Sequence, residues 1–346
     1  MLASPVCPEV FSQETKDITS EHLLMRLPKE RTLLGRSVII DLERFYQFLD
    51  GAIDVKLPRQ IALLVDWDRK ESSTNYREVS IIVGMNQPVA SSLEVFLLKE
   101  SMRGIARLGL LELSQGAHRP DYEFLYEGMI EILVDEFNHT SRRLESAWVI
   151  SKLLDEMGQL GLEVQRSWSD FSGDHSCLRN AAPGITFLLT FRELEGREKP
   201  SKFFKALKRA NLTKSLEEAF GEPASELETF WLEKVRQCRI PDEITVTPQG
   251  APQLVETTLV PDAIHPGEQL KLRFLFKKTE SMLFPEGVFV RDLRTNTLFQ
   301  AHEDSDSISV TIPVETTTPP GEYGYSVTVV DESGNLRHYG GNYKVE

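Results

Sequence analysis

The sequence predicts an α+β protein: a mostly helical body with a small sheet at its start, followed by an all-β sandwich. Helical periodicity dominates residues 90–237, and two short apolar runs precede it. After Cys238 the helix-forming residues give way to Thr, Val, Pro and Gly in alternating patterns. The expected parts are an arm over 1–35, a body over 36–239, a linker over 240–251 and a sandwich over 252–346.

Length and charge limit the classes of partner. A chain of 346 residues with 40% hydrophobic side chains can bury the cores of two domains. Its formal net charge of −14 repels phosphate backbones and anionic membranes, which argues against nucleic acid as a partner. The cysteines, Cys7, Cys177 and Cys238, are too few and too scattered for a disulfide framework or a cysteine metal site. No apolar stretch of about 20 residues occurs, so no membrane span is expected.

The first residues are mixed and polar. Residues 1–30 are expected to form an arm with little structure of its own. The opening sequence MLASPVCPEVFSQETKD has neither a basic start nor an apolar core, so it does not resemble a signal peptide. As written, the chain is expected to be cytoplasmic.

The body is expected to open as a helix, a strand, a polar loop and a second strand. Asp41–Asp50 has apolar residues at helical spacing, with Asp41 as the N-cap and Gly51 as the stop. The short apolar runs Arg59–Trp67 and Glu78–Gly84 are typical of buried strands.

The rest of the body has the apolar spacing of helices. Pro183 suits a first helical turn, because its missing N–H has no partner there in any case. The helices are expected over Ala90–Leu113, Tyr122–Phe137, Leu144–Gly158, Pro183–Leu194, Ser201–Ala210, Lys214–Phe220 and Glu226–Gln237.

The last part has alternating strands separated by Gly and Pro turns, at the spacing and number typical of an immunoglobulin-like sandwich. It contains no Cys pair and no Trp, which excludes an antibody-type domain. Tyr323 or Tyr325 could form a tyrosine corner. The strands are expected over Val255–Leu259, Gln269–Phe276, Gly287–Asp292, Thr297–Ala301, Ser307–Pro313, Gly321–Val330 and Leu336–Val345.

Two groups of residues in the body resemble motifs of the peptidase MA-like, gluzincin-type zinc metallopeptidases. The first is Tyr126-Glu127-Gly128-Met129-Ile130-Glu131, which resembles the segment that gives the third zinc ligand. The second is the helical tail Glu198–Val235, with Phe220-Gly221, Glu226-Leu227-Glu228 and Trp231-Leu232 at the family's positions. The resemblance covers residues 36–237 and implies an α+β peptidase-like fold. It leaves a periplasmic or secreted location open.

The chain departs from the family at the catalytic motif. HExxH holds zinc between two His one helical turn apart and uses the Glu as general base, and no HExxH occurs in this sequence. In the equivalent helix Lys99 and Arg103 stand where the His would be, and neither offers a lone pair to a metal. By the resemblance, Glu100 is the base position and Glu127 the third-ligand position. Either the two cations replace the charge of the metal beside Glu127 and Glu131, or the segment is an ordinary solvated helix face.

Other chemistry-bearing residues are weaker candidates. His118, just before the Glu127 helix, could join it in a non-standard site. The polar loop Ser167–Asn180 holds Asp170, Asp174, His175 and Cys177, and a Cys–His pair with a carboxylate can form a nucleophile. In the sandwich, Glu303–Asp306 has the composition of a calcium loop but lacks its Gly and closing Glu. The motifs GxxxxGK[ST], GxGxxG after a strand and GxSxG are missing from the sequence.

These observations favour a pseudoenzyme: a metallopeptidase-like protein without catalytic residues, cofactor or metal, which binds a protein or peptide. A structural subunit of an assembly is a second form of the same hypothesis. The alternative is an active metal-dependent hydrolase with a non-standard site around Glu100, His118 and Glu127.

Overall fold

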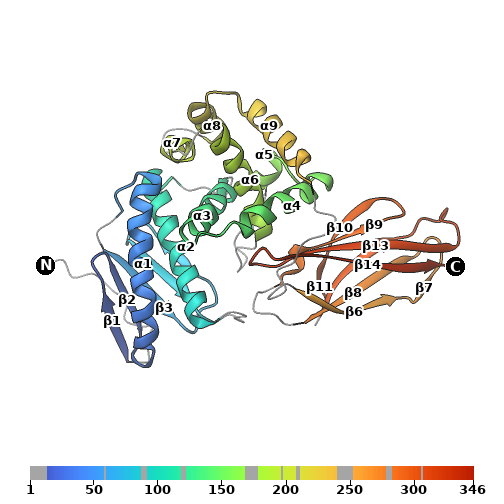
Figure 1. Cartoon of the computed structure of the whole chain (residues 1–346), viewed down its shortest axis with the longest axis horizontal. Helices are drawn as coiled ribbons and strands as arrows, with labels where there is room; N and C mark the ends of the chain where they lie inside the picture. Colours follow the sequence, from blue (N-terminus) through green and yellow to red (C-terminus); the bar gives the residue numbers. More distant parts are fainter. Residues whose placement is uncertain are drawn as a thin grey trace. The chain divides into compact units, whose positions relative to one another are not determined.

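The fold is α+β, as predicted, with a helical part followed by a β-sandwich (Figure 1). The computed structural model describes residues 14–57, 60–86, 92–117, 122–167, 178–195, 198–207, 211–239, 252–277, 283–304 and 307–346. Contacts divide the chain into two compact units, Met1–Ala117 and His118–Glu346, and each is described by itself. The expected linker, 240–251, lies outside the described residues.

The first unit contains a five-stranded sheet that begins earlier than predicted. Residues 14–28 are not an unstructured arm: they form β1 (Thr15–Thr19) and β2 (Leu23–Pro28), which pair as an antiparallel hairpin. β2 alternates, and its side chains Leu23, Met25 and Leu27 are fully buried. The short sequence LLMRLP alternates buried and less buried residues, which is typical of a strand, although the flanking residues are polar.

The order of this sheet is β1-β2-β3-β5-β4. The predicted strands are present as β3 (Ile61–Asp66) and β5 (Ser80–Gly84), and β2, β3 and β5 run parallel. β4 (Ser73–Asn75) lies in the expected polar loop and pairs antiparallel at the edge.

Two long helices accompany the sheet, α1 (Thr32–Ile53) and α2 (Leu93–Leu113). The prediction for α1 was wrong at both ends. Asp41 lies inside the helix and pairs with Arg44. The helix runs through Gly51 to Ile53, and its C-cap Asp54 has the left-handed conformation. The buried Val38 and Ile39 extend the apolar face toward the N-terminus, so the helix needs no cap at Asp41. The expected helix over 90–113 is confirmed, with Ser92 as its N-cap.

The helices of the second unit confirm the predicted segments and add one. They are α3 (Glu123–Phe137), α4 (Arg142–Glu156), α5 (Leu162–Ser167), which was not predicted, α6 (Leu178–Glu195), α7 (Glu198–Leu207), α8 (Leu212–Phe220) and α9 (Ala224–Gln237). Pro183 was expected in a first turn but lies inside α6. The fully buried Trp231 of α9 packs edge-on against Phe187 and donates a hydrogen bond to Thr186 Oγ1 at 3.0 Å. No described helix of the chain is long and apolar enough to cross a membrane.

The sandwich has two sheets, ordered β10-β9-β13-β14-β7 and β11-β12-β8-β6. All the strands expected from the sequence are present. They are β6 (Gln253–Val260), β8 (Gln269–Lys277), β9 (Val288–Asp292), β10 (Thr297–Gln300), β12 (Ser307–Pro313), β13 (Gly321–Val330) and β14 (Leu336–Val345), joined by the short β7 (Ala263–Ile264) and β11 (His302–Asp304). Leu272 and Phe274 of one sheet and Val290 and Val327 of the other belong to one buried core. The hydroxyl of Tyr323 donates to Pro319 O at 2.8 Å, which is the bond of a tyrosine corner.

Candidate functional site

The segment predicted to replace HExxH lies in the middle of α2. Ser101, Met102 and Arg103 are buried, Arg103 being 7% exposed, so this part of α2 is not an ordinary solvated face. The Arg103 guanidinium lies 3.9 Å from Glu100 Oε1, one helical turn earlier. Lys99, which directly precedes Glu100, is half-buried. The charges of this segment are therefore held partly out of water.

Glu127 belongs to the second unit, on α3, in a column of acidic side chains. Glu123, Glu127, Glu131 and Asp135 follow one another every four residues, and none is more than 7% exposed. A spacing of four places them along one side of the helix. The two units are described separately, so the predicted grouping of Glu127 with Lys99, Glu100 and Arg103 stays a prediction.

One carboxylate of this column has a cationic partner from α4. Arg143 Nη2 lies 2.8 Å from Glu131 Oε2, and both side chains are buried. The same guanidinium donates through Nη1 to the carbonyl oxygen of Glu332, in the turn between β13 and β14. A guanidinium can serve two acceptors at once because its donors form a planar fork. Arg143 thus links α3 to the sandwich.

Two further bonds fasten α4 to the same turn. Arg142 Nη1 donates to Asn335 Oδ1 at 2.6 Å, and Ser146 Oγ donates to Gly334 O at 2.7 Å. Gly334 has a positive φ of 76°, and a Cβ there would lie 2.9 Å from Arg142 O. Only glycine allows this approach of the two backbones.

The turn itself is preorganised by Asp331. Its carboxylate accepts hydrogen bonds from the backbone N of Ser333 at 3.0 Å and of Asn335 at 2.8 Å, and from Asn335 Nδ2 at 2.7 Å. These bonds fix the turn that receives Arg142 and Arg143. Sequence reasoning missed the whole arrangement, because its parts lie almost two hundred residues apart and Ser333-Gly334-Asn335 reads only as a turn.

Gly128, the residue after Glu127, has a packing role. A Cβ on Gly128 would lie 2.4 Å from the carbonyl carbon of Gly184 in α6, and one on Gly184 would lie 1.9 Å from Phe124 O. The pair of glycines therefore lets α3 and α6 cross with their backbones in contact. This crossing holds the acidic column of α3 in place.

The weaker candidates from the sequence are His118, the polar loop and the acidic run of the sandwich. His118 lies outside the described residues, as do Cys7 and, in the polar loop, Asp170, Asp174, His175 and Cys177. In the acidic run of the sandwich, Asp304 pairs with Lys271 at 2.7 Å and with Arg273 at 3.0 Å. The hydrogen bond from Lys271 is the main cause that lowers the pKa of Asp304. Residues 305 and 306 lie outside the described residues.

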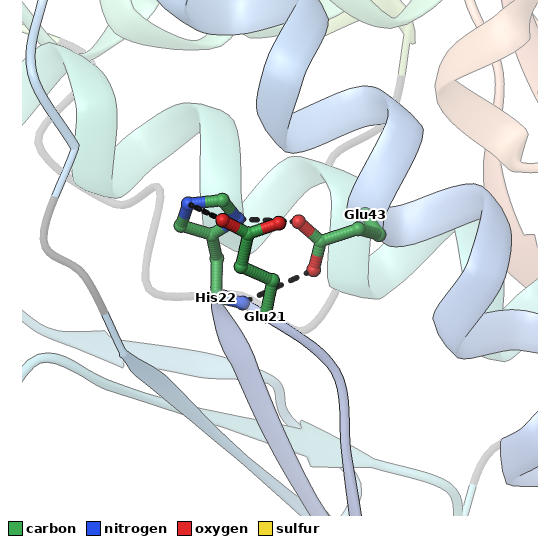
Figure 2. A group of neighbouring side chains, drawn as sticks. All are labelled: Glu21, His22 and Glu43. Carbon is green, nitrogen blue, oxygen red and sulfur yellow. Dashed lines mark hydrogen bonds and ion pairs between the residues drawn. The ribbon is translucent and has the colours of Figure 1, made fainter.

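Among the residues that the structure describes, one group of three side chains could hold a metal ion: Glu21, His22 and Glu43. Figure 2 shows both carboxylate groups beside the imidazole ring. Glu21 and His22 come from the β1–β2 connection, and Glu43 comes from α1. Sequence reasoning missed this group, because His22 has no ligand spacing and Glu43 lies on α1, with β2 between them in the chain.

Glu43 is the centre of the group. Its Oε1 is bonded to His22 Nδ1, and its Oε2 accepts from Ser20 Oγ at 2.6 Å and from His22 N at 3.2 Å. Burial raises the pKa of Glu43, but the hydrogen bonds from Ser20 and His22 outweigh it, and the pKa lies below its usual 4.5. Ser20 is bonded to Glu43 and not to His22, so the order of contacts differs from that of a serine–histidine–carboxylate triad.

Comparisons with known proteins define no family for this chain. No family model and no curated protein matches it. Among solved structures, an aminopeptidase A from Legionella pneumophila, solved with aspartic acid, is 12% identical with a TM-score of 0.39; it aligns with 89% of this chain. This chain spans 36% of that aminopeptidase. CopC from Methylosinus trichosporium OB3b aligns with 28% of this chain at 19% identity and a TM-score of 0.21. The alignment covers 93% of CopC. The DNA glycosylase AlkC from Pseudomonas fluorescens aligns with 75% of the chain and 83% of its own length, at 12% identity and a TM-score of 0.22.

Proposed function

We propose that this protein is a metallopeptidase-like binding protein that does not hydrolyse peptides. Its helical part holds the sandwich, and the sandwich binds an extended polypeptide. The observation that carries the proposal is the engagement of Glu131 by Arg143. In the family that the sequence resembles, the carboxylate at the position of Glu127 serves a metal. Here Glu131, one turn further along the same helix, pairs with a guanidinium that also fastens the sandwich turn.

The charges of α2 support the same proposal. Lys99 and Arg103 are fixed cations in a helix where the resemblance places zinc-binding histidines. Arg103 is buried, and a buried cation is retained only when other groups compensate its charge. Neither side chain offers a lone pair, so the two positions supply no zinc ligand.

The edge of the sandwich offers a surface for a polypeptide. β6 ends the sheet β11-β12-β8-β6, so among the described residues one side of it has no neighbouring strand in that sheet. Its Val255 and Val260 are 61% and 41% exposed, and Leu275 on the adjacent β8 is 47% exposed. An extended peptide can add to such an edge through its backbone, while exposed apolar side chains supply contact area.

The experiment tests hydrolysis and binding on the full chain. A pool of random peptides is incubated with zinc-supplemented protein, with and without chelator, beside Glu127→Ala. We expect no cleavage above that of the variant. Chelator-sensitive cleavage that Glu127→Ala abolishes would favour the alternative, a hydrolase around Glu100, His118 and Glu127, and would overturn the proposal.

The same pool is then passed over immobilised protein. Retained peptides should be lost when Val255 and Val260 are both replaced by Lys, because charge on an edge strand blocks strand addition. Leu33→Lys is the matched control, since Leu33 is also an exposed apolar residue, 79% exposed, but lies on α1. Equal loss in both variants would contradict a binding edge at β6.

A further inference from the structure

We infer that Glu21 and His22 form a binding site for a divalent transition-metal ion, with Glu43 as the residue that orients the histidine. The site is separate from the peptidase-like motifs and does not depend on the proposed function. The argument begins with the tautomer of His22. An ionised carboxylate can only accept hydrogen bonds, so Nδ1 bonded to Glu43 carries a hydrogen, and in the neutral ring, which is the form that binds a metal, Nε2 carries the lone pair.

The ring of His22 is held in one orientation. It stacks on Tyr46, with ring centroids 4.3 Å apart and an angle of 14° between the planes. Tyr46 is itself fixed, because its hydroxyl donates to Leu57 O at 3.0 Å. With Glu43 on Nδ1 and Tyr46 on its face, the imidazole directs Nε2 away from α1. A carboxylate on the second nitrogen of a metal-binding histidine is a recurring arrangement, which fixes the ring and makes it a stronger ligand.

A second ligand faces this nitrogen. Glu21 Oε1 lies 3.9 Å from His22 Nε2 (Figure 2). Bonds from a zinc ion to nitrogen and to oxygen are each about 2.0–2.2 Å long, so an ion fits between the two atoms with a bent geometry. Glu21 is 76% exposed and His22 23% exposed, so water can reach the ion and complete its coordination.

The ligand set points to a class of metal. Imidazole nitrogen with carboxylate oxygen suits Zn²⁺, Ni²⁺ or Cu²⁺, whereas Mg²⁺ and Ca²⁺ prefer oxygen ligands alone. Glu43 is less suited as a ligand, because both its oxygens already accept bonds from Ser20 and His22. Two protein ligands and water make a site that exchanges its ion with solvent, one open enough to be completed by a ligand from another molecule.

The test is a calorimetric titration of chelator-stripped full-length protein with Zn²⁺, and with Mg²⁺ as the negative control. We expect one Zn²⁺ equivalent per chain that Glu21→Gln weakens and His22→Phe abolishes. The Phe ring keeps the contact with Tyr46, and Glu21 is exposed, so at least the Glu21 variant retains its fold. Glu43→Gln should weaken binding about tenfold, as is typical for the partner of a ligating histidine.

The matched control is the pair His265 and Glu268, a histidine whose backbone N donates to the carboxylate three residues later. His265→Phe and Glu268→Gln should leave the titration unchanged. Nitrogen NMR of the imidazoles gives a second measurement: Nε2 of His22 should shift on adding Zn²⁺. Binding that survives both Glu21→Gln and His22→Phe, or no binding at all, would overturn the inference. Metal lost in Glu127→Ala but kept in His22→Phe would contradict both the inference and the proposed function. Peptide cleavage together with metal binding that His22→Phe abolishes would contradict the proposed function alone, so the two failures are distinguishable.

Discussion

Asp292 and Tyr343 show how single polar residues are accommodated inside the sandwich. Asp292 is fully buried and accepts hydrogen bonds from the Tyr343 hydroxyl at 3.0 Å and from Arg294 Nη2 at 3.1 Å. Burial raises the pKa of Tyr343, and the negative charge of Asp292 raises it further, to about 12. The neutral phenol is therefore the form that the folded state favours.

This pKa has a consequence for stability at high pH. The folded-state pKa of Tyr343 lies above the ordinary 10.0, so its stabilising effect is complete below pH 10.0 and disappears as pH rises through about 12. We expect the tyrosinate absorbance of the wild type minus that of Tyr343→Phe to titrate near pH 12. A difference that titrates near pH 10.0 would show that neither burial nor the charge of Asp292 raises the pKa of this phenol.

Arg143 is the residue whose loss should matter most among those of α4. Replacing it with Met removes the guanidinium from the buried Glu131 carboxylate, and breaking a buried ion pair typically costs about 3–5 kcal/mol in the free energy of unfolding. Urea unfolding measures this. The double variant Glu131→Met/Arg143→Met should recover part of the loss, because neither buried charge then remains. If the double variant is no more stable than the single one, the ion pair is not the cause.

At the scale of the element, the crossing of α3 and α6 depends on two glycines. Gly128→Ala would place a Cβ 2.4 Å from backbone atoms of α6, so the helices must move apart. Overpacking of this kind typically destabilises by about 1–3 kcal/mol. Gly51→Ala is the matched control: it also lies in a helix, but a Cβ there meets nothing within 4 Å. It should raise stability by about 0.5–1 kcal/mol, because Ala favours the helix.

Thermal unfolding of the two variants tests this contrast. The prediction is a lower midpoint for Gly128→Ala and an unchanged or higher one for Gly51→Ala. Similar shifts in both would mean that helix propensity, and not the contact with Gly184, decides the effect.

The elements also show what the sequence could predict. The strands β12, β13 and β14 begin and end at the predicted residues, because each alternates and is bounded by Pro or Gly turns. β1 and β2 were missed because they are short and lie among polar residues. The predicted start of α1 was too late because Asp41 resembles an N-cap residue, whereas the helix begins at Thr32. Pro183 was placed in a first turn, whereas α6 begins at Leu178.

The sites were harder to predict than the elements. Sequence reasoning identified Glu127 and Glu131 through a motif, but it offered no way to find Arg143, whose partners belong to α3 and to a distant turn. It likewise set His22 aside as isolated. The contacts of both residues join elements that are separated in the chain, and no local pattern encodes such contacts.

At the scale of the whole molecule, the turn between β13 and β14 couples the helical part of the second unit to the sandwich. Arg142, Arg143 and Ser146 donate to the turn, and Arg291 of β9 pairs with Glu156 at the end of α4. These contacts are polar and directional, so they require the turn to keep one conformation. Under the proposed function, this coupling would hold the sandwich at a fixed place, so that less freedom is lost when a polypeptide docks.

Gly334→Ala should break this coupling without unfolding either part. Its positive φ is strained for Ala, and the added Cβ would meet the backbone of Arg142 and Arg143 at 2.9 Å. Gly267→Ala is the control for the strain: Gly267 also has a positive φ, 94°, in a turn of the sandwich, and a Cβ there would meet the side chain of Thr316 at 3.1 Å but no backbone atom within 4 Å. Hydrogen exchange measured across a urea series should give one midpoint for α4 and β14 in the wild type and in Gly267→Ala. In Gly334→Ala the two midpoints should separate, since the sandwich then unfolds independently of the helices; coincident midpoints in that variant would show that the modules are coupled elsewhere.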